Sequence, residues 1–342
     1  MKQHWQQWAA GRESRAATYF GVLFGTAIIT ILAIRGFLAI TGYPQLGGES
    51  LHIAHMLWGG LFMLAAIITL LYVHGHRAKV VGAFLGGVGF GFFIDELGKF
   101  ITNNNDYFYQ PAAMLIYIIF LLLWALFSWL DNYVPTTSRQ QFVDVLTRLR
   151  DASVHGMTEQ DEQYAKQQLS RLGIAKKEQK ALLAYVSTFA PTYRPHSYTQ
   201  TTKQFGEKLR KVRRVVLKSR FTPIIVYATI TVSAASTAVV LLLALLNNQN
   251  IFDIYPAVPI LVEVGLMVAS VVSIGCVAVG FWYSKRNWHN TLVWYKLSLL
   301  VNVFATQVFL FYINQFTAVF GLAFSLLLLY VLTILEGDYA KK

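Results

Sequence analysis

Residues 80–101 read VVGAFLGGVGFGFFIDELGKFI, and this stretch decides the fold. It is apolar and long enough to cross a bilayer as one helix. Asp95, Glu96 and Lys99 nevertheless stand near its end. An ionisable side chain at membrane depth is costly, so it needs a partner and often marks a functional site. The stretch therefore predicts a membrane helix that carries a candidate site.

Seven other apolar runs of similar length surround this one. Hydrophobic residues make up 55% of the 342-residue chain and charged residues only 13%, which is typical of a polytopic helical membrane protein. We therefore expect an all-α protein with about eight transmembrane helices, four before and four after a helical insert. The other runs are 17–40, 51–73, 111–130, 221–246, 257–283, 291–313 and 316–335.

The predicted organisation has five parts along the chain. They are an amino-terminal segment at 1–16, a first membrane half at 17–130, an insert at 131–220, a second membrane half at 221–335 and a tail at 336–342. The insert is strongly basic: between Thr136 and Arg220 it has 17 Lys and Arg against 7 Asp and Glu, which accounts for +10 of the formal charge of +12. The rest of the chain is nearly neutral.

The distribution of Lys and Arg predicts the orientation. One set of connections holds the basic residues of both termini and of the insert, whereas the opposite connections, 41–50, 102–110, 247–255 and 314–315, have no Lys or Arg. Positive residues gather on the cytoplasmic side. We therefore expect a multi-pass plasma-membrane protein, with both termini and residues 131–220 in the cytoplasm.

The last part of the insert, residues 203–220, has eight basic residues and one acidic residue, with apolar residues at helical spacing. This pattern predicts an amphipathic helix that binds anionic lipid at the membrane surface. It has no nucleic-acid motif and few aromatic residues for base stacking, so no nucleic acid is expected as a partner. Membrane lipids are the expected partners, and a homo-oligomer is possible.

Several ionisable residues are expected at one depth, near the outer end of the bundle. They come from four predicted helices and one loop, namely Arg35, His52, His55, Asp95, Glu96, Lys99, Asp106 and Glu263. Asp95, Glu96, Lys99, Arg35 and Glu263 are candidates for a site that binds an ion or a small solute. Their structural alternative is a set of ion pairs that only hold helices together.

His52 and His55 are three residues apart and share one helix face. Completed by Asp106 or by Asp95 or Glu96, they could hold a divalent metal such as zinc with an open position for water. The alternative is two histidines at the membrane interface that bond loop carbonyls. The single cysteine, Cys276, excludes a cysteine-based metal cluster.

The segment from Gly89 to Thr102, GFGFFIDELGKFIT, is followed by Asn105-Asp-Tyr-Phe108 and by Pro111-Ala112. Together with His52-x-x-His55 this pattern resembles uncharacterised bacterial polytopic membrane proteins, over about residues 50–125. The resemblance implies a membrane protein and no particular activity.

We expect an integral membrane transport protein, a transporter or a channel, because buried charges on several helices mark ion and proton pathways. Two alternatives stay open. One is a membrane-embedded metal-dependent hydrolase that acts on an outer-leaflet lipid, with His52 and His55 as ligands. The other is a non-catalytic assembly or sensor protein that acts through the insert. Whether the protein is an enzyme is thus left open by the sequence.

Overall fold

The computed structural model confirms the all-α fold. The residues it describes are helical or connect helices, and those residues contain no β-strand. The described residues are 13, 15–41, 55–102, 109, 111–133, 138–157, 159–171, 176–188, 224–234, 258–284 and 286–339.

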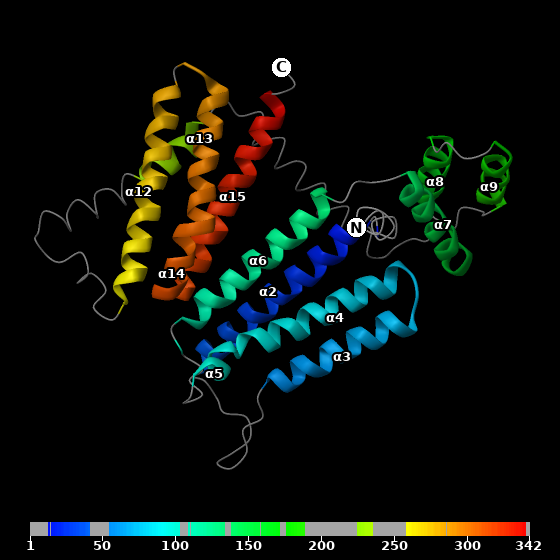
Figure 1. The fold of residues 1–342 in the computed structure, drawn as a ribbon, viewed down its shortest axis with the longest axis horizontal. Coiled ribbons are helices and arrows are strands. Elements are labelled where there is room, and N and C mark those ends of the chain that lie inside the picture. The colour runs from blue at the N-terminus through cyan, green and yellow to red at the C-terminus, as the bar shows by residue number, and fades with distance from the viewer. Residues whose placement is uncertain are drawn as a thin grey trace, which may run out of the picture. The chain divides into compact units, whose positions relative to one another are not determined.

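Six helical segments are long and apolar enough to cross a membrane (Figure 1). They are α2 (Ala16–Thr41), α4 (His76–Asp95), α6 (Ala112–Tyr133), α12 (Ile260–Tyr283), the continuous segment α13 (Trp288–Val301), η2 (Asn302–Thr306) and α14 (Gln307–Ile313), and α15 (Gln315–Tyr339). Two shorter apolar helices, α3 (Met56–Tyr72) and Ile224–Ala234, fall in the runs predicted at 51–73 and 221–246. Each predicted run therefore contains an apolar helix, and six of them meet the length of a span.

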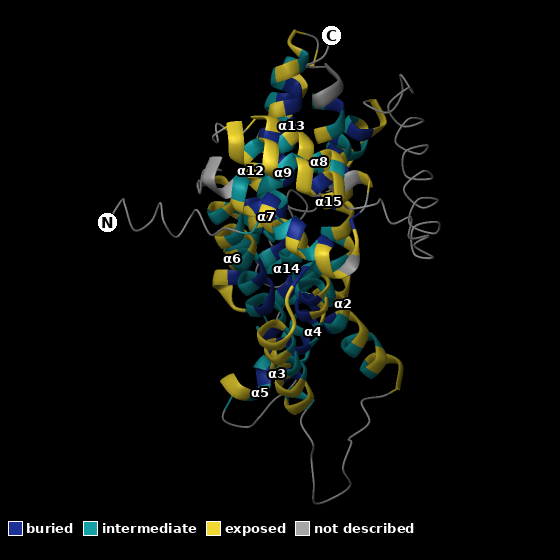
Figure 2. Ribbon diagram, turned by 90° about the vertical axis from the view of Figure 1, so that its right-hand side faces the viewer, coloured by how far each residue is buried: buried dark blue, intermediate teal, exposed yellow. Residues whose placement is uncertain are grey.

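Exposed residues lie along the outward faces of these helices (Figure 2), and many of them are large and apolar. Leu71 on α3, Leu261 on α12 and Phe320 on α15 are all more than 75% exposed. Soluble monomers rarely expose large contiguous apolar patches, whereas a membrane helix presents such side chains to lipid. The structure is thus compatible with a polytopic membrane protein.

The chain divides into two compact units, Met1–Tyr107 with Leu122–His196 and Phe108–Leu121 with Ser197–Lys342. In the first unit α4 packs against both α2 and α3. Glycine makes this packing close, because a Cβ atom on Gly89 would lie 2.6 Å from the carbonyl oxygen of Gly59 on α3. A Cβ atom on Gly87 would overlap Thr26 and Leu23 of α2. Small residues at these positions let the helix backbones touch.

The prediction of one continuous helix over 80–101 is wrong at a single residue. Helix α4 ends at Asp95, and the short helix α5 (Leu97–Ile101) begins after Glu96. Glu96 has φ −84° and ψ 9°, in the sparsely populated bridge region, where turn and active-site residues are often found. Its carbonyl still accepts a hydrogen bond from the Lys99 amide at 3.0 Å. The helix is therefore interrupted next to the charged residues Asp95, Glu96 and Lys99.

In the second unit α12 and α13 form an antiparallel hairpin. The hydroxyls of Ser273 and Ser298 lie 2.8 Å apart. A Cβ atom on Gly280 would lie 2.6 Å from the ring of Tyr295, which makes this another close glycine contact. Tyr295 also belongs to the main apolar core of this unit, which joins α12, α13, α15 and the helix Ile224–Ala234. These contacts fix the register of the two helices.

The described residues of the predicted insert form three helices, α7 (Ser138–His155), α8 (Glu159–Arg171) and α9 (Lys176–Thr188), in agreement with the prediction that the insert is helical. Their shared core includes Val145, Leu169 and Val186. Tyr164 on α8 donates a hydrogen bond to Asp144 on α7 at 2.9 Å. The pKa of Tyr164 is raised, mainly because the side chain is buried and further because the Asp144 carboxylate is nearby. The basic stretch 203–220 lies outside the described residues, so lipid binding there stays a prediction.

Candidate functional site

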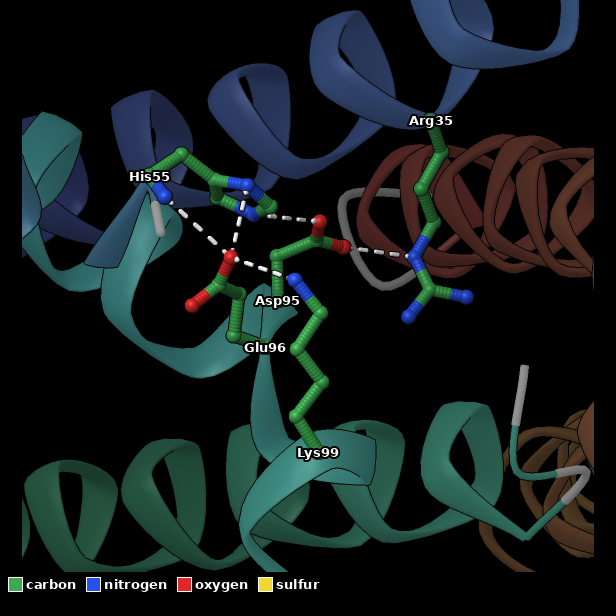
Figure 3. Close-up of polar contacts among 5 residues, drawn as sticks. All are labelled: Arg35, His55, Asp95, Glu96 and Lys99. Carbon is green, nitrogen blue, oxygen red and sulfur yellow. Dashed lines mark hydrogen bonds and ion pairs between the residues drawn. The ribbon is translucent and has the colours of Figure 1, made fainter. Parts of the chain in front are cut away.

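Five of the predicted residues meet at the break between α4 and α5 (Figure 3). Arg35 comes from α2 and His55 precedes α3, whereas Asp95 ends α4, Glu96 forms the break and Lys99 lies on α5. The side chains of Asp95 and Glu96 have no exposed surface. We call Arg35, His55, Asp95, Glu96 and Lys99 the charged cluster.

Asp95 pairs with cations from two other elements. Its Oδ1 accepts a hydrogen bond from Nε of Arg35 at 2.6 Å, and its Oδ2 lies 3.3 Å from Nε2 of His55. Both partners are partly exposed, with 14% of the Arg35 side chain and 21% of the His55 side chain accessible. A fully buried carboxylate is stable only with such partners, so Asp95 ties α2 and the start of α3 to α4.

Glu96 uses its two oxygens unequally. Its Oε1 accepts from the backbone amide of His55 at 3.2 Å, from Nδ1 of His55 at 2.9 Å and from Nζ of Lys99 at 3.1 Å. Its Oε2 is buried and has no hydrogen-bond partner among the described residues. Buried polar atoms are nearly always bonded, so this oxygen is available to a proton or a ligand.

His55 determines the charge of the cluster. Its two ring nitrogens face two different carboxylates, which accept and cannot donate. Both nitrogens donate only in the imidazolium form. With His55 charged, three cations face two carboxylates and the cluster has one net positive charge. Beside two ionised acids, a neutral His55 would donate to only one of them, so a bridge to both ionised acids requires the imidazolium form.

The metal hypothesis finds no support in the described part of the chain. No group of three His, Cys, Asp or Glu side chains there is arranged to hold a metal ion. Both ring nitrogens of His55 face carboxylate oxygens, at 3.3 Å from Asp95 and 2.9 Å from Glu96. His52 and Asp106 lie outside the described residues. Their part in a zinc site therefore stays a prediction.

Glu263 lies on α12 of the second unit and is 4% exposed. The sequence predicts that Glu263 lies near the other ionisable residues. This stays a prediction, because Glu263 and the charged cluster belong to different compact units. The sequence analysis also missed a polar group of the second unit within an apolar run, formed by the buried Thr306 and Gln307 and the half-buried Asn302. These residues are uncharged, so a search for charges passes over them. The sequence signal for this group was that Thr306 and Gln307 follow Asn302 by four and five residues, which places them near one another on a helix.

A second polar region lies at the other end of α4. Gly75 precedes the helix with φ 106°, and Asp151 of α7 accepts a hydrogen bond from the amide of His76 at 3.2 Å. A pocket of about 300 Å³ adjoins this contact, and Lys79, Asp144 and Arg150 are among its lining residues. Its charges are mixed in sign, so it favours no single class of ligand. It does show that the insert packs on the α3–α4 turn.

The chain matches no known family model, no curated protein and no solved structure. Its function is therefore argued from the geometry of these residues alone.

Proposed function

We propose that the protein is a membrane transport protein, a transporter or a channel, and that the charged cluster is its ion- or solute-binding site. One observation carries the proposal. The His55 imidazole bridges two fully buried carboxylates at the point where a membrane-length helix is broken. Many transporters build their binding sites on discontinuous helices, and ionisable side chains within membrane helices often mark ion pathways.

The chemistry of the cluster favours a proton as a bound ion. Release of a proton from His55 removes one of its two donors, which leaves one buried carboxylate without a hydrogen bond to the ring. That carboxylate then binds a proton or another cation, or its side chain moves to a new position. Because His55, Asp95 and Glu96 join three elements, a change of protonation changes the contacts between α3 and the α4–α5 break. Such a change is what a proton-coupled transport cycle requires.

The finer localisation belongs to the same proposal. The Lys and Arg distribution supports an orientation with both termini and the insert in the cytoplasm. The bacterial inner membrane is part of the proposal through the resemblance of residues 50–125 alone. The charged cluster would then lie toward the outer face, and residues 203–220 would bind anionic lipid inside. Cysteine labelling tests this in a Cys276→Ser background, because Cys276 is the only cysteine. Ser153→Cys should react only from the cytoplasmic side and Thr41→Cys only from outside.

The transport assay uses purified protein in liposomes that contain a trapped pH-sensitive dye. A potassium diffusion potential drives protons, and a panel of amino acids, organic acids and inorganic ions is added in turn. We expect wild-type protein to move protons, alone or with one solute, and His55→Gln to reduce that flux at least about tenfold. Glutamine has no ring to bridge both acids.

The matched control is His289→Gln, because His289 is exposed near the start of α13. It should leave proton flux unchanged. Transport is excluded as the role of the cluster when folded His55→Gln protein moves protons as fast as wild type. It is also excluded when wild-type vesicles match protein-free vesicles under every condition of the panel.

A further inference from the structure

The helical segment from Trp288 to Ile313 contains one widened turn. Residues Asn302–Thr306 form a π-helical turn, in which the amide of Gln307 donates to the carbonyl of Asn302, five residues earlier. Such turns are rare and often occur at functional sites, because they displace side chains and free backbone groups. Here Tyr117 of α6 donates its hydroxyl proton to the carbonyl of Val303 at 2.6 Å. The turn is thus held by a neighbouring helix, and its Val303 and Thr306 are buried.

Polar side chains gather at this turn. The Oδ1 atom of Asn302 lies 3.2 Å from Nε2 of Gln307, which donates to it. The hydroxyl of Ser325 on α15 lies 2.9 Å from the same Oδ1 and shares its proton with the carbonyl of Gly321. We call Asn302, Thr306, Gln307 and Ser325 the polar turn. The Gln307 amide and the Ser325 hydroxyl thus share Asn302 Oδ1 as an acceptor.

Two oxygens of the polar turn have no hydrogen-bond partner among the described residues. They are Oγ1 of Thr306 and Oε1 of Gln307, on residues that are 7% and 2% exposed. An unpartnered buried polar atom is rare in a native protein and indicates a ligand or a functional constraint. Both atoms belong to consecutive residues at the end of the same widened turn.

Thr306 differs from three threonines on the helices of the first unit. Thr26, Thr30 and Thr69 each donate to the carbonyl four residues earlier, at 2.8 Å. This local bond is the usual way in which a threonine hydroxyl is satisfied in a helix. The π-helical turn shifts the carbonyl four residues before Thr306, so the hydroxyl has no such bond. The widened turn therefore creates the open oxygen.

We propose that the polar turn binds a monovalent alkali cation, with Thr306 Oγ1 and Gln307 Oε1 as ligands. Both atoms are hard oxygen donors, which suit an alkali metal ion, and unwound membrane helices coordinate Na⁺ through backbone carbonyl oxygens of similar character. The polar turn contains no carboxylate, whereas Ca²⁺ and Mg²⁺ sites in proteins rely on carboxylates. The Gln307 amide oxygen disfavours an anion, and a monovalent cation is a ligand that both neutral oxygens can bind.

This site is separate from the charged cluster and goes beyond the proposed function. It lies in the other compact unit and shares no residue with the cluster. Cation binding can therefore be measured whether or not the protein moves protons. The chemistry also differs, because the polar turn responds to the identity of the cation and the charged cluster to protons.

The test uses full-length protein in detergent at constant pH and ionic strength. The melting temperature is measured while NaCl or KCl replaces choline chloride, and binding of radioactive ²²Na⁺ is measured in parallel. A cation that binds only the folded protein raises the melting temperature in a saturable way. We expect saturable stabilisation by Na⁺ or K⁺ and none by choline.

Thr306→Val is the decisive variant. It replaces an unpartnered hydroxyl with a methyl group of the same shape, so the cation-free protein should be as stable as wild type or more so. Its affinity for the alkali cation should fall at least about tenfold. Gln307→Met, which also removes a ligand oxygen, should show the same loss of affinity.

Thr333→Val is the matched control. Thr333 is exposed on α15 and donates to the carbonyl of Leu329 at 2.8 Å, so this change should leave cation binding unaltered. The proposal is overturned when Na⁺, K⁺ and choline give the same melting curves and ²²Na⁺ does not bind in a saturable way. It is also overturned when Thr306→Val binds the cation with wild-type affinity. Either result would mean that Thr306 Oγ1 and Gln307 Oε1 bind water and no alkali cation.

Discussion

The charged cluster and the polar turn are two ways of interrupting a membrane-length helix. At the first, the helix stops at Asp95 and resumes at Leu97, and both buried acids meet cations from other elements. At the second, the helix continues through a π-helical turn, and only neutral side chains are present. A buried charge requires a compensating charge, whereas a neutral oxygen is less costly to leave open. The cluster therefore joins elements, and the polar turn keeps oxygens for a ligand.

The largest expected effect comes from removing one acid of the charged cluster. Asp95→Ala leaves Arg35 and His55 without the carboxylate that they share, and breaking a buried ion pair in this way destabilises a protein by about 3–5 kcal/mol. The measurement is the midpoint of unfolding followed by tryptophan fluorescence. The double variant Arg35→Met with Asp95→Leu should recover much of the loss, because no unpaired charge is left between these two residues. An Asp95→Ala protein as stable as wild type would show that the pair contributes no stability.

Variants of Glu96 test whether an ion pair contributes more to stability when it is buried than when it is exposed. Glu96→Gln keeps an acceptor for Lys99 and His55 but removes the charge, so we expect a loss of about 1.5–3 kcal/mol, the range for hydrogen bonds to charged groups. Glu336→Gln is the matched control, since Glu336 pairs with Lys296 at 2.9 Å but is 36% exposed. Exposed pairs contribute at most about 1 kcal/mol. Equal losses for the two variants in the same unfolding assay would contradict a special role for the break.

The two interruptions also show what a sequence can predict. The helix at 17–40 was predicted within one residue of each observed end, because its apolar run and its flanks are strong local signals. The sequence also led to Arg35, His55, Asp95, Glu96 and Lys99, since charges in apolar runs are conspicuous. Neither interruption was predicted. The bridge conformation of Glu96 and the π-helical turn depend on partners from distant parts of the chain, such as His55 and Tyr117.

The polar turn has a smaller effect on stability because it carries no net charge. Asn302→Leu removes the acceptor of Gln307 Nε2 and of the Ser325 hydroxyl, and we expect a loss of about 1–2 kcal/mol. Ser325→Ala removes only one donor and should cost about half as much. Unfolding midpoints of both variants, measured without Na⁺ and K⁺, give the comparison. A loss of stability for Asn302→Leu as large as that for Asp95→Ala would mean that charge does not explain a difference in stability between the charged cluster and the polar turn.

The smallest expected effect lies at the opposite end of α4 from the charged cluster. Gly75 supplies no side chain to cap the helix, and Asp151 of the insert accepts from the first amide instead. Asp151→Ala should cost about 1 kcal/mol, the usual value of a lost helix cap. Asp151→Asn keeps a side-chain oxygen and should cost less. Hydrogen exchange of the His76 amide adds a local readout: it should rise in Asp151→Ala, while amides near Glu96 stay protected. Faster exchange at both ends of α4 would show instead that the insert contact and the charged cluster are energetically coupled through the helix.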